Sequence, residues 1–251
     1  MGNEFKLIQI TDTHLFADKS TYHYGINTWQ TYQLTLQQLL KNKEYADTIL
    51  LTGDISHDGS IAAYEAIKNS LKKFNAPVYA INGNHDNPQN LKAVFSEASF
   101  SMNKLFHWKN WSFILLDSFL VGKKSGRLSN DELDFLTLTL SQHKQQSIVI
   151  ILHHHPLKVY GSMDNYILKN REEFLSLLLQ YKNVKLVLFG HIHQEFYASL
   201  KHIQFIGSPS TCLQLKPNCY QFTIERLGPA YRTFIFNPSG YRSHIKRVVN
   251  Y

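Results

Sequence analysis

The sequence is poor in cysteine, glycine and proline. Its 251 residues include 2 cysteines, 12 glycines and 7 prolines. Cys212 and Cys219 have neither the CxxC spacing of a zinc site nor the cysteine density of a disulfide-stabilised secreted domain. Hydrophobic residues make up 43% of the chain, which argues against intrinsic disorder. A chain of this length can bury a sizeable core without disulfides, so we expect one domain over residues 1–251.

Long hydrophobic runs are lacking as well. No stretch approaches the roughly 18 apolar residues that span a bilayer, and the start, MGNEFKLIQITDTH, lacks the pattern of a signal peptide. These absences predict a cytoplasmic protein with reduced thiols and no membrane partner. The formal net charge is +7, but the basic residues are scattered and no DNA-binding motif is present. We therefore expect no nucleic-acid partner.

Short apolar runs alternate with helical patterns along most of the chain. Runs rich in Ile, Leu and Val predict buried strands at 6–10, 48–53, 78–83, 111–117, 147–153 and 185–191. Apolar residues at helical spacing predict helices around 29–40, 61–74, 133–140 and 174–181. Ser60 and Ser129 are expected N-caps, and Asn170 precedes the last helix. This alternation is typical of an α/β sheet with helices on its faces.

The last fifty residues have a different pattern. Short strands are predicted at 203–209, 220–226, 232–236 and near 243–249. Prolines fall between these runs, as expected for turns. The pattern predicts an antiparallel meander, and its last strands offer an edge for a homodimer.

Histidine is abundant, with 13 residues, and most of the histidines follow predicted strands. Five strands run into Asp12-Thr13-His14, Gly53-Asp54, Gly83-Asn84-His85-Asp86, His153-His154-His155-Pro156 and Gly190-His191-Ile192-His193. Each motif alone has an ordinary explanation, such as a chance pair, a turn, a helix cap or a half-exposed histidine cluster. Ligands of open α/β sheets bind beyond the carboxyl ends of the strands. Five such motifs in a row therefore favour one polar site at one edge of the sheet.

The residue types in these motifs narrow the chemistry. Carboxylates, imidazoles and one amide, without thiolate, suit iron, manganese or zinc. Seven candidate ligands are too many for one tetrahedral ion but suffice for two ions that share a carboxylate. Two ions about 3.5–4 Å apart clamp the attacking and leaving oxygens of a phosphoryl displacement. The sequence therefore predicts a centre of two divalent metal ions.

The order of these motifs resembles that of the calcineurin-like metallophosphoesterases. The resemblance covers nearly the whole chain and implies a four-layer α/β/β/α sandwich, with mixed sheets, flanking helices and C-terminal antiparallel strands. The segments ITDTHLFADKSTYHYGINTW, TGDISHDGSIAAYEAI, INGNHD and LHHHPL are similar to bacterial class III cyclic-nucleotide phosphodiesterases. That similarity implies hydrolysis of 3′,5′-cyclic nucleotides, cyclic AMP foremost, to 5′-monophosphates by a hydroxide that bridges two metals.

The resemblance also assigns roles to residues. It implies that Asp12, His14 and His193 hold one metal, that Asn84, His153 and His191 hold the other, and that Asp54 bridges them. The chain departs from the family's His-His-Pro-Pro pattern because His155 replaces the first proline, which leaves His154 and His155 as alternatives to His153.

The remaining roles concern the substrate. His85 is expected to donate a hydrogen bond or proton to the leaving oxygen or to a phosphoryl oxygen, with Asp86 as its orienting carboxylate. Asn84, His85 and His193 are expected to contact the substrate. Other candidates, which are equally well explained as ordinary loop residues, are Tyr160, Asp164, Asn165 and Asn170, and the basic Lys123, Lys124 and Arg127.

Other functions share these motifs and stay open. They are hydrolysis of glycerophosphodiesters or nucleotides, nucleic-acid cleavage, and a metal-free scaffold on the same fold. An activity panel, the salt dependence of DNA binding, and activity under added metals separate these alternatives.

Overall fold

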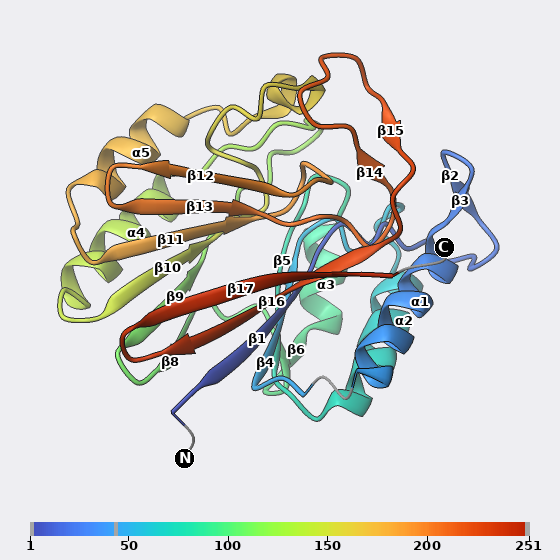
Figure 1. The fold of residues 1–251 in the computed structure, drawn as a ribbon, viewed down its shortest axis with the longest axis horizontal. Coiled ribbons are helices and arrows are strands. Elements are labelled where there is room, and N and C mark those ends of the chain that lie inside the picture. Colours follow the sequence, from blue (N-terminus) through green and yellow to red (C-terminus); the bar gives the residue numbers. More distant parts are fainter. Residues whose placement is uncertain (1–2, 43–44, 249–251) are drawn as a thin grey trace.

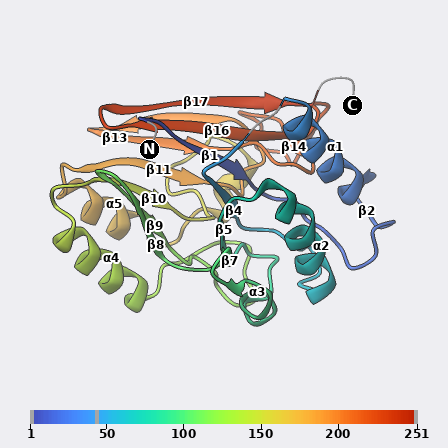
Figure 2. The same cartoon turned by 90° about the horizontal axis from the view of Figure 1, so that it is seen from below.

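Two β-sheets lie face to face in the computed structural model, and helices cover both outer faces (Figures 1 and 2). The structure describes residues 3–42 and 45–248. Helices α1 to α3 lie on one side and α4 and α5 on the other. This is the α/β/β/α sandwich that the resemblance implied.

The first sheet has seven strands in the order β17-β16-β1-β4-β5-β7-β6. Strands β1, β4, β5 and β7 are parallel, and β16, β17 and β6 are antiparallel to their neighbours. The bounds are β1 Phe5–Ile10, β4 Thr48–Thr52, β5 Val78–Ile81, β6 Ser96–Glu97, β7 Phe100–Ser101, β16 Ala230–Asn237 and β17 Gly240–Arg247.

The second sheet has six strands in the order β12-β13-β11-β10-β9-β8. Its four central strands are parallel and its two edge strands antiparallel. The bounds are β8 Leu105–Trp108, β9 Trp111–Leu115, β10 Ser147–Ile151, β11 Val184–Phe189, β12 Phe196–Leu200 and β13 Ile203–Gly207. Two small hairpins complete the strands, namely β2 Tyr22–His23 with β3 Ile26–Asn27, and β14 Gln214–Leu215 with β15 Ile224–Glu225.

The helix bounds are α1 Thr28–Lys41, α2 Ile61–Leu71, α3 Pro88–Val94, α4 Asn130–Gln142 and α5 Arg171–Leu179, with 3₁₀ turns at Lys72–Phe74 and Ser162–Tyr166. Two of the helices, α2 and α4, begin at the expected caps. Ser60 Oγ accepts a hydrogen bond from Ala63 N–H, and Ser129 Oγ accepts one from Glu132 N–H. Asn170 precedes α5, but its side chain bonds to the backbone of Leu128 instead of capping the helix.

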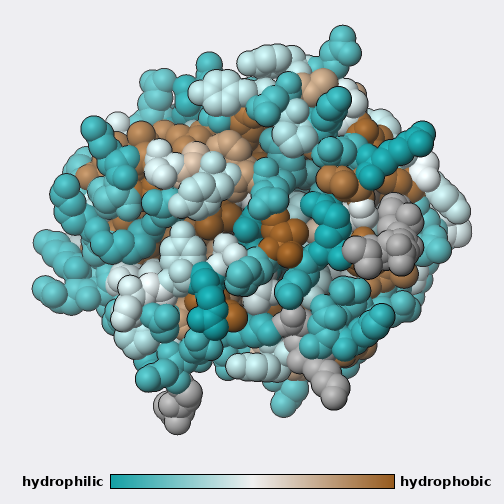
Figure 3. Space-filling view, viewed as in Figure 1, coloured by the Kyte–Doolittle hydropathy of each residue, from teal (hydrophilic) through white to brown (hydrophobic). Residues whose placement is uncertain are grey.

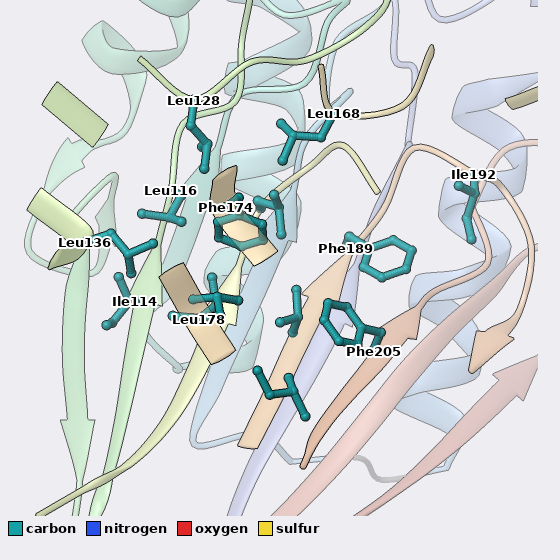
Figure 4. Packing of buried hydrophobic residues seen from close by; sticks show 14 of the residues in the cluster. Ile114, Leu116, Leu128, Leu136, Leu168, Phe174, Leu178, Phe189, Ile192 and Phe205 are labelled. Carbon is teal, nitrogen blue, oxygen red and sulfur yellow. The ribbon is translucent and has the colours of Figure 1, made fainter. Parts of the chain in front are cut away.

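Three buried clusters hold the layers together. One lies between the sheets and includes Leu7, Leu50, Phe113 and Phe234. A second packs α1 to α3 onto the first sheet. The third packs α4 and α5 onto the second sheet, with Phe174 and Leu178 of α5 among its residues (Figure 4). The surface seen in Figure 3 is mostly hydrophilic, with scattered hydrophobic patches.

The predicted C-terminal meander is wrong in part. Strand β13 lies in the second sheet, parallel to β11, while β16 and β17 form a hairpin on the edge of the first sheet. Within 220–226 only β15 is extended, and residue 249 of the last predicted strand lies outside the described residues. The difference is explained by burial. Ile203, Phe205 and Ile206 of β13 are buried in the second sheet. The chain then crosses to the first sheet, where it forms β16 and β17.

Candidate metal centre

The carboxyl ends of five strands meet at one edge of the sandwich. Strands β1, β4 and β5 come from one sheet and β10 and β11 from the other, so two sheets contribute where one sheet edge was expected. The motifs that follow these strands place Asp12, His14, Asp54, His153, His191 and His193 together, and all six side chains are buried.

Asp54 lies between two groups of histidines. Its Oδ2 atom is 3.6 Å from His14 Nε2 and 3.5 Å from His153 Nε2. On one side, His193 Nε2 is 3.1 Å from His14 Nε2 and 3.4 Å from Asp12 Oδ1. On the other side, His191 Nδ1 is 3.2 Å from His153 Nε2. One carboxylate oxygen thus faces both groups, which is the position of a bridging ligand.

The distances from the carboxylate oxygens of Asp12 and Asp54 to the histidine nitrogens, 3.4 to 3.6 Å, fit metal ligands. Metal bonds of about 2.0–2.2 Å at tetrahedral angles put neighbouring ligand atoms about 3.3–3.6 Å apart. Asn84 Oδ1 is buried and has no hydrogen-bond partner within the described parts of the chain. A buried polar atom without a partner is unfavourable, and a coordinated cation would satisfy it. The donor set and this orphaned atom therefore fit divalent metals.

Backbone carbonyls set the tautomers of two of the histidines. His153 Nδ1 lies 2.8 Å from Thr52 O, and His193 Nδ1 lies 3.0 Å from Leu213 O. A carbonyl only accepts, so each Nδ1 carries the proton and donates it. The Nε2 atom of each ring then faces the carboxylates, as it does in metal-ligating histidines.

Hydrogen bonds also orient the carboxylates of Asp12 and Asp54. Asp12 Oδ2 accepts hydrogen bonds from the Thr11 hydroxyl at 2.7 Å and from His191 N–H at 3.0 Å. Asp54 Oδ1 accepts one from His85 N–H at 2.8 Å, which leaves Oδ2 to face the histidines.

Burial and mutual charge shift the pKa values of this cluster. Burial lowers the pKa of His14 and His191 well below the ordinary value. Burial opposes ionisation of Asp54, but His153 and His14 outweigh it and hold the pKa of Asp54 well below its ordinary value. Burial also opposes protonation of His153, yet Asp54 and Asp12 raise its pKa to about 9. The site therefore combines an ionised Asp54 with the neutral rings of His14 and His191, and its carboxylates favour positive charge beside them, as at His153.

The backbone is strained where these residues occur. Positive φ angles between 46° and 68° occur at Asp12, His14, Asp54, His191 and His193. Such conformations cost about 1–3 kcal/mol each for residues other than glycine and gather at functional sites. Close packing adds a second constraint, because a Cβ on Gly53 (φ 93°) would lie 2.3 Å from His153 Nδ1. The local backbone is thus shaped for the placement of side chains, at a cost in stability.

Asp86 has other partners than the predicted His85 ring. Its carboxylate accepts hydrogen bonds from the N–H groups of Ile55, Ser56 and Gly83 and from the Tyr64 hydroxyl at 3.0 Å. Burial and the nearby Asp54 raise the pKa of Asp86 to about 7. The carboxylate therefore joins the loop after β4 to the loop after β5.

The triple histidine is divided among three environments. His153 faces Asp54, as described above. His154 Nδ1 contacts Ser118 Oγ at 2.8 Å, although its ring also lies beside His153 and His191. His155 Nε2 lies 3.7 Å from Asp164. The geometry thus favours His153 over its neighbours as the partner of Asp54.

A cavity of about 230 Å³ opens beside the cluster. His85 and Asn84 line it, and so does Lys124 from the predicted basic loop. Tyr160, Asp164, Asn165 and Asn170 do not line it. The lining residues that sequence reasoning left without a role are His23, Tyr24, His57, Met163, Tyr166, Leu213, Leu215 and Phe222. The residues in or beside the hairpins β2–β3 and β14–β15 have a weak sequence signal, because the strands of these hairpins have only two residues each.

None of the described helices is long and apolar enough to cross a membrane.

The chain is similar to several known proteins. A 3′,5′-cyclic adenosine monophosphate phosphodiesterase, CpdA of Escherichia coli K12, is 36% identical over 237 residues, which cover 94% of this chain and 86% of that protein. A 3′,5′-cyclic-nucleotide phosphodiesterase of Nostoc sp., alr5338, is 35% identical over 244 residues, which cover 96% of this chain and 92% of that protein.

Solved structures share the fold at low identity. A dimetal phosphatase from Danio rerio has a TM-score of 0.69 and 16% identity, and the match covers 97% of this chain and 99% of that one. A purple acid phosphatase from yellow lupin has a TM-score of 0.70 and 13% identity, with 100% and 52% covered. The family profile of the calcineurin-like phosphoesterases matches residues 5–195. The sandwich fold, the cluster of His and Asp side chains and these relatives agree with this match. The chain therefore belongs to the calcineurin-like phosphoesterase family.

Proposed function

We propose that this protein hydrolyses 3′,5′-cyclic nucleotides, cyclic AMP foremost, to 5′-monophosphates with the help of two divalent metal ions. The observation that carries the proposal is the position of Asp54 Oδ2, which lies 3.6 Å from His14 Nε2 and 3.5 Å from His153 Nε2. The names of the relatives from Escherichia coli and Nostoc sp. support the choice of substrate.

Seven residues would hold the metals. Asp12, His14 and His193 would hold one ion, Asn84, His153 and His191 the other, and Asp54 would bridge them. When bound, the two ions would neutralise phosphoryl charge and lower the pKa of a coordinated water. The mixed nitrogen and oxygen donors favour iron, manganese or zinc.

His85 would act on the leaving group. Formation of a 5′-monophosphate breaks the bond between phosphorus and the ribose O3′, and that oxygen needs a proton. The His85 ring lines the cavity and stacks on His57 with ring centroids 4.4 Å apart. From there it would donate a hydrogen bond or proton to O3′, a contribution of about 10²–10⁴ in rate. Asn84 and His193 would contact the phosphoryl group.

Asp86 would be a positioning residue. It bonds to the backbone on both sides of the site, at Ser56 and Gly83, and so would keep the loop that carries Asn84 and His85 against the loop that carries Asp54.

We further propose that residues 1–251 form one domain and that the protein acts in the cytoplasm, with no nucleic-acid partner. The late hairpin of β16 and β17 would supply the edge of a homodimer.

An activity panel tests the proposed function. Metal-depleted protein is reloaded with manganese, iron or zinc and assayed with cyclic AMP, cyclic GMP, bis(p-nitrophenyl) phosphate and p-nitrophenyl phosphate. We expect the diesters to be cleaved and cyclic AMP to have the highest kcat/KM. Cleavage of the monoester with no cleavage of any diester would refute the phosphodiesterase.

A further inference from the structure

Two exposed aromatic rings from distant parts of the chain meet at the mouth of the cavity. Tyr24 lies in the turn of the β2–β3 hairpin, and Phe222 precedes β15. Their ring centroids are 5.2 Å apart, and the rings are 61% and 48% exposed. Figure 1 shows both hairpins at the same end of the molecule. Exposed aromatic surface beside a cavity is typical of a binding site.

Two chemically different sets of side chains line the cavity. One set is polar and includes Asp54, Asn84, Lys124 and the histidines of the candidate metal centre. The other set is apolar or aromatic, namely Tyr24, Met163, Tyr166, Leu213, Leu215 and Phe222. A ligand that suits both sets combines a charged group with a flat, weakly polar ring.

Local structure fixes the position of Tyr24. Tyr24 and Gly25 both have positive φ, 49° and 78°, as in the two-residue hairpin turn that joins His23 to Ile26. The His23 ring packs edge-on against the Tyr24 ring, with the ring centroids 4.6 Å apart. The centroids of the His23 and His57 rings are 4.2 Å apart. His57 Nδ1 in turn lies 3.1 Å from His14 Nδ1. A continuous row of rings therefore connects Tyr24 to a candidate metal ligand.

We infer that Tyr24 and Phe222 form a platform on which the heterocyclic base of the substrate stacks while its phosphate faces the metal centre. The inference rests on the proposed function and extends it to the recognition of the base. Stacking on aromatic rings tolerates any base, because every base has a π-face. The platform therefore favours nucleotides over other phosphodiesters without selecting adenine by hydrogen bonds.

The test compares cyclic AMP with a substrate that lacks the base. Tyr24→Ala, Phe222→Ala and the double variant are assayed on cyclic AMP and on the 1-O-methyl riboside 3′,5′-cyclic phosphate. Loss of one stacking contact should raise KM for cyclic AMP roughly 5- to 150-fold. The base-free substrate should keep its KM within about twofold. Tyr24→Phe and Phe222→Tyr should restore KM, and Tyr197→Ala, an exposed ring on β12, is the matched control.

A second measurement separates the inference from the proposed function. Saturation-transfer NMR with adenosine, which has no phosphate, should detect binding to the wild type and lose it in the double variant, with or without metal. Suppose that the wild type cleaves cyclic AMP. If the alanine variants then have an unchanged KM for cyclic AMP, or if KM rises equally for cyclic AMP and for the base-free substrate, the platform is wrong and the proposed function stands. If the wild type does not cleave cyclic AMP, the proposed function fails, and absence of the adenosine signal would then overturn the platform as well.

Discussion

The direction of each imidazole lone pair determines whether the cluster can hold a cation. His153 and His193 each donate Nδ1–H to a backbone carbonyl, so Nε2 faces Asp54 or Asp12. His85 differs from them because its backbone N–H donates to Asp54. At the residue scale, the candidate ligands and the proposed proton donor can therefore be separated by mutation.

Replacement of His85 tests this separation. His85→Ala should lower kcat on cyclic AMP by about 10²–10⁴ and leave the metal content at two ions per chain, because the ring acts on the substrate. Steady-state kinetics and elemental analysis measure the two quantities. His244→Ala, on the exposed side of β17, is the control. Loss of metal from the His85 variant would contradict its role.

The loops at the strand ends are joined by carboxylates. Asp86 connects the loop after β4 to the loop after β5, and Asp58 connects the segment after Ser56 to Ala17. These carboxylates accept hydrogen bonds from backbone N–H groups in loops, outside the helices and strands. At the element scale they hold together the loops that follow β1, β4 and β5 of the first sheet.

Asp86 should therefore matter for stability as well as for rate. Asp86→Ala leaves the buried N–H groups of Ile55, Ser56 and Gly83 without their acceptor. We expect the free energy of unfolding to fall by about 3 kcal/mol. Urea denaturation measures it, with the exposed Asp134→Ala as control. Unchanged stability with reduced activity would show that Asp86 acts on the chemistry directly.

Asp58 gives the stability a pH dependence. Burial raises its pKa, but hydrogen bonds from Ala17 N–H and from Ser60 and Ser56 outweigh burial and hold the pKa below its ordinary value. A carboxyl with a depressed folded pKa stabilises the fold above its unfolded pKa of about 3.9, and this contribution is lost as pH falls through the folded pKa. Asp58→Asn should therefore destabilise by under about 1 kcal/mol at pH 6.

Denaturation curves between pH 3 and pH 7 check this prediction. The difference between the wild type and the Asn variant should shrink toward acid. A difference that stays constant over the whole range would rule out a contribution from ionised Asp58.

The elements differ in how far the sequence could predict them. The central strands and the caps at Ser60 and Ser129 follow from apolar runs and local hydrogen bonds, and both are found. The partner of β13 does not follow from local pattern, because parallel pairing with β11 depends on where the chain returns in space. In the site, the strand-end motifs predicted the residues that lie together in the candidate metal centre. Tyr24 and Phe222 lie in hairpins too short to have a pattern, and the partners of Asp86 depend on tertiary contacts.

At the scale of the whole molecule, the candidate metal centre joins the two sheets. Asp12 and Asp54 follow strands of the first sheet, and His153 and His191 follow strands of the second. An ion bound between them would bind the folded chain and not the unfolded one, which stabilises the fold by mass action.

Removal of metal should therefore lower the melting temperature. A metal concentration 100-fold above Kd adds about 2.7 kcal/mol, which corresponds to several degrees. Calorimetry with and without a chelator measures the shift, and Asp54→Ala, which lacks the bridging carboxylate, should lose most of it. An equal shift in the wild type and this variant would place the metal elsewhere.

A metal titration is the most direct test of the proposed phosphodiesterase activity with two metal ions per chain. Metal-depleted protein is titrated with manganese while the rate of 5′-AMP formation from cyclic AMP is followed by chromatography. The proposed function predicts a rate that rises with added metal and saturates at two equivalents per chain. Saturation at one equivalent, or cyclic AMP left intact at any metal content, would contradict it.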